Sequence, residues 1–143
     1  MSVEENKALV RRGIEALNTR NWALVSELIA PNFLDHNPLP DQVPGVEGLK
    51  RSRTALHTDA FPDLKNTIED VIAEGDKVVV RLTVSGTRRG EFTGIAPTNK
   101  RVSWTTIIIY RIVGGKLAER CTNTDTLGMM QQLGVVTIKT ASK

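Results

Sequence analysis

Residues 102–124 read VSWTTIIIYRIVGGKLAERCTNT and predict a long β-hairpin. The β-branched and aromatic residues of 102–113 favour one strand, and residues 116–124 form the returning strand. Gly114-Gly115 between them suits a two-residue hairpin turn, because glycine readily adopts the positive φ angles that such a turn needs. The hairpin is therefore the centre of a predicted antiparallel sheet.

A two-residue turn also predicts which residues share a face of this hairpin. Val113 would lie opposite Lys116, and opposed residues of an antiparallel pair lie on the same face. One face then carries four residues from each strand: Trp104, Thr106, Ile108 and Tyr110 beside Glu119, Cys121, Asn123 and Asp125. Two carboxylates and an amide would be costly in a packed apolar core. A face that lines a small-molecule cavity can hold them, so this face predicts a ligand pocket.

The opposite face of the hairpin is apolar in its middle and basic at its ends. Ile107 and Ile109 both project from it. Contiguous exposed apolar area on a sheet marks contact sites, and a two-fold axis would bury the same patch in both copies. We expect a homodimer through this face; the alternative is an ordinary half-exposed sheet surface.

Helical periodicity occupies the first part of the chain. Ser2 and Glu5 form a capping box before a first helix, and Asn21 caps a second helix that Pro31 closes. Residues 33–40 contain two prolines and predict a loop across the mouth of the pocket. A third helix follows Gly48 and stops at residues 61–63, with His57 on its polar side.

Strand periodicity takes over after residue 63. Residues 64–73 and 78–84 predict two strands before the hairpin, and Asp125 can cap a last short helix that ends at Gly134. Helices followed by antiparallel strands predict an α+β fold with the helices packed on one face of a curved sheet. One domain is expected over residues 1–134, with a C-terminal tail at 135–143.

Composition argues against several classes of protein. The 143 residues hold 19 Lys and Arg against 16 Asp and Glu, a net charge of +3 with no basic run that would indicate nucleic-acid binding. One cysteine and two histidines argue against a disulfide framework and a metal site. No stretch is apolar enough to predict a secretory signal or a membrane span. We expect a cytoplasmic protein with no nucleic-acid or membrane partner.

Motifs along nearly the whole chain resemble the SnoaL-like polyketide cyclase family. They are DHNP at 35–38, FPDL at 61–64, IEDVIAEGDKV at 68–78, GEFTGI at 90–95 and DTLGMMQQLG at 125–134. The resemblance implies the cone-shaped nuclear-transport-factor-2-like fold with a deep pocket. It also implies ring closure by intramolecular aldol condensation, with no metal or organic cofactor. An aspartate at the end of the last strand would be the acid/base, and Asp125 matches that position.

The residues with candidate roles have alternative interpretations. Asp125 is an acid/base whose pKa desolvation beside Trp104 would raise, or simply a helix cap. His36 is a candidate catalytic residue that positions a substrate oxygen by a hydrogen bond, or it only pins the 33–40 loop. Asn123 and Glu119 would contact the ligand from the Asp125 face, while Glu119 could instead extend to the rim.

Apolar and aromatic candidates complete the predicted pocket. Trp104 and Tyr110 are packing residues or ligand platforms, and Ile108 and Cys121 are apolar lining. The predicted function is acid/base chemistry on a hydrophobic, carbonyl-bearing small molecule, by ring closure or by isomerase- or hydrolase-like chemistry. Where this chain has Arg88, Thr106, Ile108 and Arg120, the family usually shows histidine or glutamate. A non-catalytic, dimeric binding module of the same fold is therefore the alternative.

Overall fold

The computed structural model describes residues 2–39, 42–91, 96–137 and 139. A five-stranded sheet runs in the order β1-β5-β4-β3-β2, built from β1 (Ile29–Asp35), β2 (Lys65–Glu74), β3 (Lys77–Thr87), β4 (Arg101–Val113) and β5 (Lys116–Thr124). The helices are α1 (Val3–Asn18), α2 (Trp22–Leu28), α3 (Gly45–Thr54) with the π-helical turn η1 (Ala55–Ala60), and α4 (Thr126–Gln132). Part of the GEFTGI motif, Pro40 and most of the C-terminal tail lie outside the described residues.

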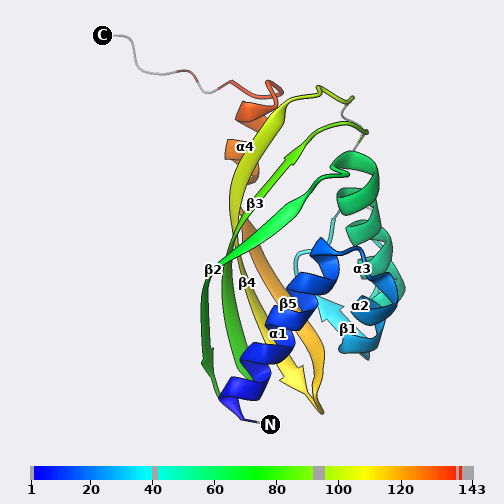
Figure 1. Cartoon of the computed structure of the whole chain (residues 1–143), viewed down its shortest axis with the longest axis vertical. Coiled ribbons are helices and arrows are strands. Elements are labelled where there is room, and N and C mark those ends of the chain that lie inside the picture. Colours follow the sequence, from blue (N-terminus) through cyan, green and yellow to red (C-terminus); the bar gives the residue numbers. More distant parts are fainter. Residues whose placement is uncertain (1, 40–41, 92–95, 138, 140–143) are drawn as a thin grey trace.

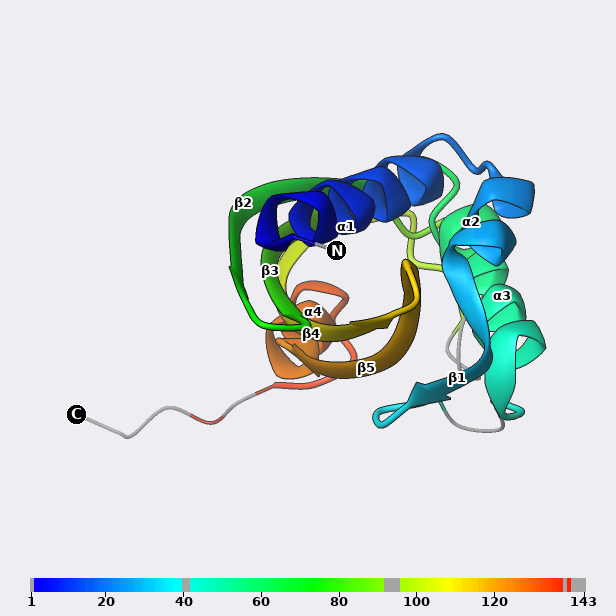
Figure 2. The ribbon, with the colours of Figure 1, turned by 90° about the horizontal axis from the view of Figure 1, so that it is seen from below.

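The sheet curls strongly, and α1, α2 and α3 lie along its open side (Figures 1 and 2). Seen from below, β2, β3, β4 and β5 form a curved wall, with α1 across the open side and α3 beside it (Figure 2). Alternate residues of β4 are buried along the strand, so one face of the wall belongs to the core and the other faces solvent. The predicted α+β cone is confirmed.

The helix termini follow the capping residues of the sequence. The Ser2 hydroxyl accepts a hydrogen bond from the Glu5 amide, and the Glu5 carboxylate accepts one from the Ser2 amide. The Asn21 side chain accepts from the Leu24 amide and begins α2. These local bonds satisfy amides that would otherwise lack partners at the first turn, which is why the predicted starts agree with the structure.

Strand β1 was not predicted, because its residues were assigned to the end of a helix and to a loop. It pairs with β5 in parallel, so the sheet is mixed rather than wholly antiparallel. Pro31 lies in this edge strand, where a missing N–H is tolerated. The burial along β1 does not alternate, and its strand partner β5 comes far later in the chain, so no local pattern marks it.

The predicted register of the hairpin is wrong beyond its first two pairs. Gly114 and Gly115 both have positive φ, and Val113 pairs with Lys116 as expected. Ile112 then pairs with Leu117, but Arg111 pairs with Glu119, so Ala118 is an extra residue on β5. This β-bulge exchanges the faces of every later residue of β5, because side chains alternate with a period of two.

The π-helical turn η1 explains why the predicted position of His57, on the polar side of the third helix, is wrong. The Phe61 amide donates to the Leu56 carbonyl, five residues back, which widens the turn and shifts the phase of the helical face. His57 consequently lies inside, only 2% exposed, rather than on a polar surface.

Helix α4 protects the part of β4 that extends beyond the end of β5. The Ser103 amide donates to Gln132 Oε1 (2.8 Å), and Gln132 Nε2 donates to the Ser103 carbonyl (2.6 Å). The Gln132 side chain thus replaces the missing strand at this edge. No helix among the described residues is long and apolar enough to cross a membrane.

Candidate functional site

A cavity of about 440 Å³ occupies the inside of the cone. Its apolar walls come from α1, α2, α3 and the concave faces of β3 and β4, and α4 contributes two methionines. The apolar lining includes Ile14, Leu28, Phe33, Leu82, Trp104, Ile108 and Met129. Asn37, Thr124 and Thr126 line the cavity and are exposed, so they lie where it opens to solvent.

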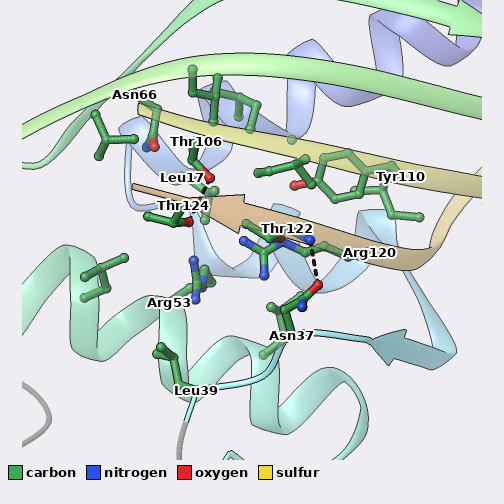
Figure 3. Close-up of a pocket in the computed structure, with 18 of the residues that line it drawn as sticks. Leu17, Asn37, Leu39, Arg53, Asn66, Thr106, Tyr110, Arg120, Thr122 and Thr124 are labelled. Carbon is green, nitrogen blue, oxygen red and sulfur yellow. Dashed lines mark hydrogen bonds between the residues drawn. The ribbon is translucent and has the colours of Figure 1, made fainter. Parts of the chain in front are cut away.

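A small set of polar side chains points into this apolar space (Figure 3). They are Arg53 of α3, Asn66 of β2, Tyr110 of β4 and Arg120 of β5. Thr106 and Thr124 share a hydrogen bond of 2.9 Å across the two last strands. Apolar walls with a few convergent polar groups are the usual composition of a small-molecule site.

Arg120 belongs to a buried ion pair with Asp35 of β1. Its guanidinium lies 3.3 Å from the Asp35 carboxylate, and the two side chains are only 8% and 6% exposed. Asp35 also accepts hydrogen bonds from Gln42 Nε2 (3.1 Å) and from the Asn37 amide (3.1 Å). The carboxylate thus joins β5, β1 and the following loop on one side of the cavity.

Arg53 has no such carboxylate partner. Among the described residues its guanidinium makes no ion pair, and the hydrogen-bond contact of that group is with the neighbouring Ser52 hydroxyl at 3.5 Å. Burial, together with the like charge of Arg120, lowers the pKa of Arg53 to about 9. The guanidinium therefore remains protonated at neutral pH and brings a positive charge to the cavity.

His57 supports Arg53 and Asn66 from behind the lining. Its Nδ1 donates to the Arg53 carbonyl (3.0 Å), and its Nε2 accepts from Asn66 Nδ2 (3.1 Å). Burial and the positive charge of Arg53 lower the pKa of His57 to about 3. A neutral His57 satisfies both hydrogen bonds, and it adds no charge to the site.

The structure brings three of the predicted pocket residues to the cavity. Trp104, Ile108 and Tyr110 all line it, and the Trp104 ring packs against Phe61 with 5.3 Å between centroids. The 33–40 loop also contributes, since Asn37 and Leu39 line the cavity. The Asn37 side-chain oxygen accepts from the Thr122 amide of β5 (2.8 Å; Figure 3), which fastens the loop to the sheet.

Three other predicted pocket residues lie on the opposite face of the sheet. The bulge at Ala118 turns Glu119, Cys121 and Asn123 outward, and Cys121 and Asn123 are exposed. Arg120, Thr122 and Thr124 take the inward positions instead. The prediction that Glu119, Cys121 and Asn123 line the pocket is wrong, because it assumed a hairpin register without the bulge at Ala118.

Glu119 has partners on that outer surface. It forms an ion pair with Arg111 and a 2.7 Å contact with His36 Nε2. The hydrogen bond from Arg111, followed by that from His36, holds the pKa of Glu119 below its usual range. His36 therefore lies against β5 outside the cavity, and its contact favours the loop-pinning interpretation over ligand binding.

Asp125 lies at the rim rather than in the cavity lining. It is exposed, and its Oδ1 accepts from the Gly128 amide (2.9 Å) as the N-cap of α4. The predicted position opposite Trp104 is wrong, because β5 ends before that point and the register is shifted. Its chain neighbours Thr124 and Thr126 both line the cavity, so Asp125 lies next to the lining without being part of it. This position does not test its catalytic role, which stays a prediction.

The charged residues of the cavity were not predicted from the sequence. Arg53 lies between Leu49 and Leu56 at spacings of four and three, which places all three on one helical face. The adjacent buried residues Leu117 and Ala118 signal the bulge that turns Arg120 inward. Among the described residues, no three His, Cys, Asp or Glu side chains lie together as a metal site would require.

Comparison with known proteins places this cavity in a family. The family model for SnoaL-like polyketide cyclases matches residues 7–133. The chain is 34% identical over 132 residues to aklanonic acid methyl ester cyclase DnrD of Streptomyces peucetius, covering 88% of each protein. It is 31% identical over 135 residues to aklanonic acid methyl ester cyclase AcmA of Streptomyces galilaeus, covering 92% of each.

The fold agrees with this assignment. The structure of TsrD from Streptomyces laurentii superposes with a TM-score of 0.86 at 28% identity, over 95% of this chain and 99% of that one. AclR of Streptomyces galilaeus, described as a putative hydroxylase, superposes with a TM-score of 0.82 at 28% identity, over 95% of this chain and all of the other. The sequence match over most of the chain and the shared architecture lead to one conclusion: this chain belongs to the SnoaL-like polyketide cyclase family.

Proposed function

We propose that the protein is an enzyme that closes a ring in a hydrophobic, carbonyl-bearing small molecule by an intramolecular aldol-type reaction. The observation that carries this proposal is the apolar cavity of about 440 Å³ with its few inward polar groups. Such a space can hold a folded polyketide-sized molecule, and the family membership favours cyclisation.

The reaction needs a proton acceptor and groups that stabilise developing negative charge. A base removes a proton from the carbon next to a carbonyl, and the enolate carbon forms a bond to a second carbonyl carbon of the same molecule. The second carbonyl oxygen then takes up a proton, so the product is an isomer of the substrate. The Tyr110 hydroxyl offers an uncharged donor that can hold the enolate oxygen in a site shielded from water.

Asp125 is the proposed proton acceptor in this scheme. One carboxylate oxygen caps α4, while no hydrogen bond among the described residues involves Oδ2. Its position beside Thr124 and Thr126 supports the proposal, because a substrate in the opening would reach the rim. His36 acts in this scheme by holding the loop to β5 through Glu119.

Two adjacent threonines of β4 provide a test of whether ring closure takes place in the cavity. Thr106→Phe fills the space where Thr106 faces inward, and Thr105→Phe places the same ring on the exposed face. With aklanonic acid methyl ester as the substrate, Thr106→Phe should lower the ring-closing rate roughly tenfold or more, since small displacements of reacting groups are costly. Thr105→Phe should keep the wild-type rate, measured by chromatography of the cyclised product.

Two outcomes of this assay contradict the proposal. A protein that binds the ester in the cavity but forms no cyclised product is the non-catalytic binding module. A folded Thr106→Phe variant with the wild-type rate shows that the reaction takes place elsewhere. Thermal melting of both variants distinguishes loss of activity from loss of the fold.

We also propose that the protein forms a homodimer through the convex face of the sheet. Ile72, Val79 and Ile109 lie side by side across β2, β3 and β4, and Ile72 and Ile109 are 63% and 41% exposed. Charged residues of both signs flank this row: Asp70 and Arg81 on one side, and Glu74, Lys77, Arg111 and Glu119 on the other. A second copy related by a two-fold axis would match both the apolar row and the charges.

Ile109→Glu is expected to convert the dimer to a monomer. A carboxylate in the middle of a self-complementary apolar contact would face its own copy across the axis. Light scattering should give twice 15.7 kDa for the wild type and 15.7 kDa for the variant. Leu34→Glu, at a 50% exposed position of β1, should remain a dimer. A monomeric wild type at micromolar concentration would disprove the interface.

A further inference from the structure

The cavity carries an excess positive charge. Two guanidinium groups line it, those of Arg53 and Arg120, and Asp35 is the carboxylate that contacts one of them. Asp35 already accepts hydrogen bonds from Arg120, Gln42 and the Asn37 amide. The neutral His57 behind Arg53 adds no charge, so one positive charge remains without a counter-charge among the described cavity residues.

Arg53 is the group that holds this excess charge. Its guanidinium points into the cavity, toward β5 (Figure 3). No described carboxylate forms an ion pair with it, and its contact with Ser52 is at the limit of hydrogen bonding. Arg53 is partly buried in the apolar cavity, where a charge without an ion-pair partner is costly, and this cost falls when an opposite charge binds beside it.

The remaining walls define what else the ligand must be. Apart from the polar groups described above, the lining is aliphatic and aromatic, with Leu49 and Leu56 on either side of Arg53 along the helix. A guanidinium presents its donors in a planar fork that matches the two oxygens of a carboxylate. The ligand should therefore combine one ionised acid group with a broad apolar body.

We propose that the cavity selects the ionised free acid of its ligand, with the carboxylate bound to Arg53. This inference rests on the proposed function, because it concerns the same cavity, and it predicts that the cavity binds an acid more tightly than the corresponding ester. The substrate class would then differ from that in the names of the DnrD and AcmA relatives, which are cyclases of a methyl ester.

A matched pair of flat aromatic probes tests the selection. Anthraquinone-2-carboxylate and its methyl ester share one apolar body and differ in the charged group. Titration calorimetry at pH 7 should show that the acid binds at least about tenfold more tightly than the ester, the order expected of a charge-assisted hydrogen bond. Equal affinities, or tighter binding of the ester, would overturn the inference.

Substitution of Arg53 assigns the effect to one residue. Arg53→Met should weaken binding of the acid about tenfold or more and leave the ester unaffected. Arg51→Met removes an exposed charge from the same helix and should change neither affinity. If Arg53→Met folds and still prefers the acid as the wild type does, Arg53 is not the carboxylate site and the assignment is wrong.

Failure of the acid selection can be distinguished from failure of the proposed cyclase function. Tight binding of the acid without any ring closure would leave the acid selection intact and remove the cyclase proposal. Ring closure of a neutral ester with no preference for the acid would leave the cyclase proposal intact and remove the acid selection. Thermal melting of Arg53→Met provides the folding control.

Discussion

Replacing Arg120 by methionine is expected to lower the free energy of unfolding by about 3–5 kcal/mol, the usual cost of removing one partner from a buried ion pair. Asp35 would keep its hydrogen bonds from Gln42 and the Asn37 amide but lose its counter-charge in a site where its side chain is 6% exposed. Chemical denaturation at neutral pH measures the loss.

Two further variants test whether the loss of stability in Arg120→Met arises from the burial of its ion pair. Arg101→Met removes the partner of Asp63 in an ion pair whose side chains are 67% and 44% exposed, and it should cost less than about 1 kcal/mol. Adding Asp35→Asn to Arg120→Met should recover part of the stability, because the buried carboxylate that lost its partner is then replaced by a neutral amide. A loss below about 1 kcal/mol for Arg120→Met would show that the cavity already hydrates Asp35.

Asp125→Asn is expected to lower the ring-closing rate by about 10²–10⁴-fold, the usual contribution of a general acid/base. The variant keeps the side-chain oxygen that caps α4, now 2.9 Å from the Gly128 amide, so the free energy of unfolding should change by less than about 0.5 kcal/mol. Product formation and chemical denaturation on the same preparation measure the two effects.

Asp125→Ala is the companion variant for the structural role. It removes both the proton acceptor and the cap, so it should lose activity and also about 1 kcal/mol of stability. If Asp125→Asn retains the wild-type rate within a few-fold, the carboxylate only caps α4 and another group accepts the proton. That result would agree with the exposed position of Asp125 outside the cavity lining.

Features that depend on neighbours in the chain could be predicted from sequence. The capping box of Ser2 and Glu5, the Asn21 cap and the Gly114-Gly115 turn all involve residues within four positions of one another. Each satisfies backbone groups or φ angles locally, so the residue type and the structure are linked directly. The order of helices and strands, and with it the α+β class, follows from the same kind of signal.

Features that depend on distant segments could not be predicted in this way. Strand β1 exists because β5 provides its hydrogen-bond partners, and Asp35 is buried because Arg120 of β5 lies opposite it. Neither partner is near in sequence. The π-helical turn that buries His57 likewise depends on packing, since no local residue pattern distinguishes it from an ordinary helix end.

The cone, its family and the inward positions of Trp104, Ile108 and Tyr110 could all be predicted from the residue pattern. Which residues of β5 share that cavity depends on the packing of the folded chain. One extra residue at Ala118 inverts the alternation of the strand, so Arg120 faces inward while Glu119 and Cys121 face solvent. Because a strand has a period of two, a single bulge changes the chemistry of the whole site from acidic to basic.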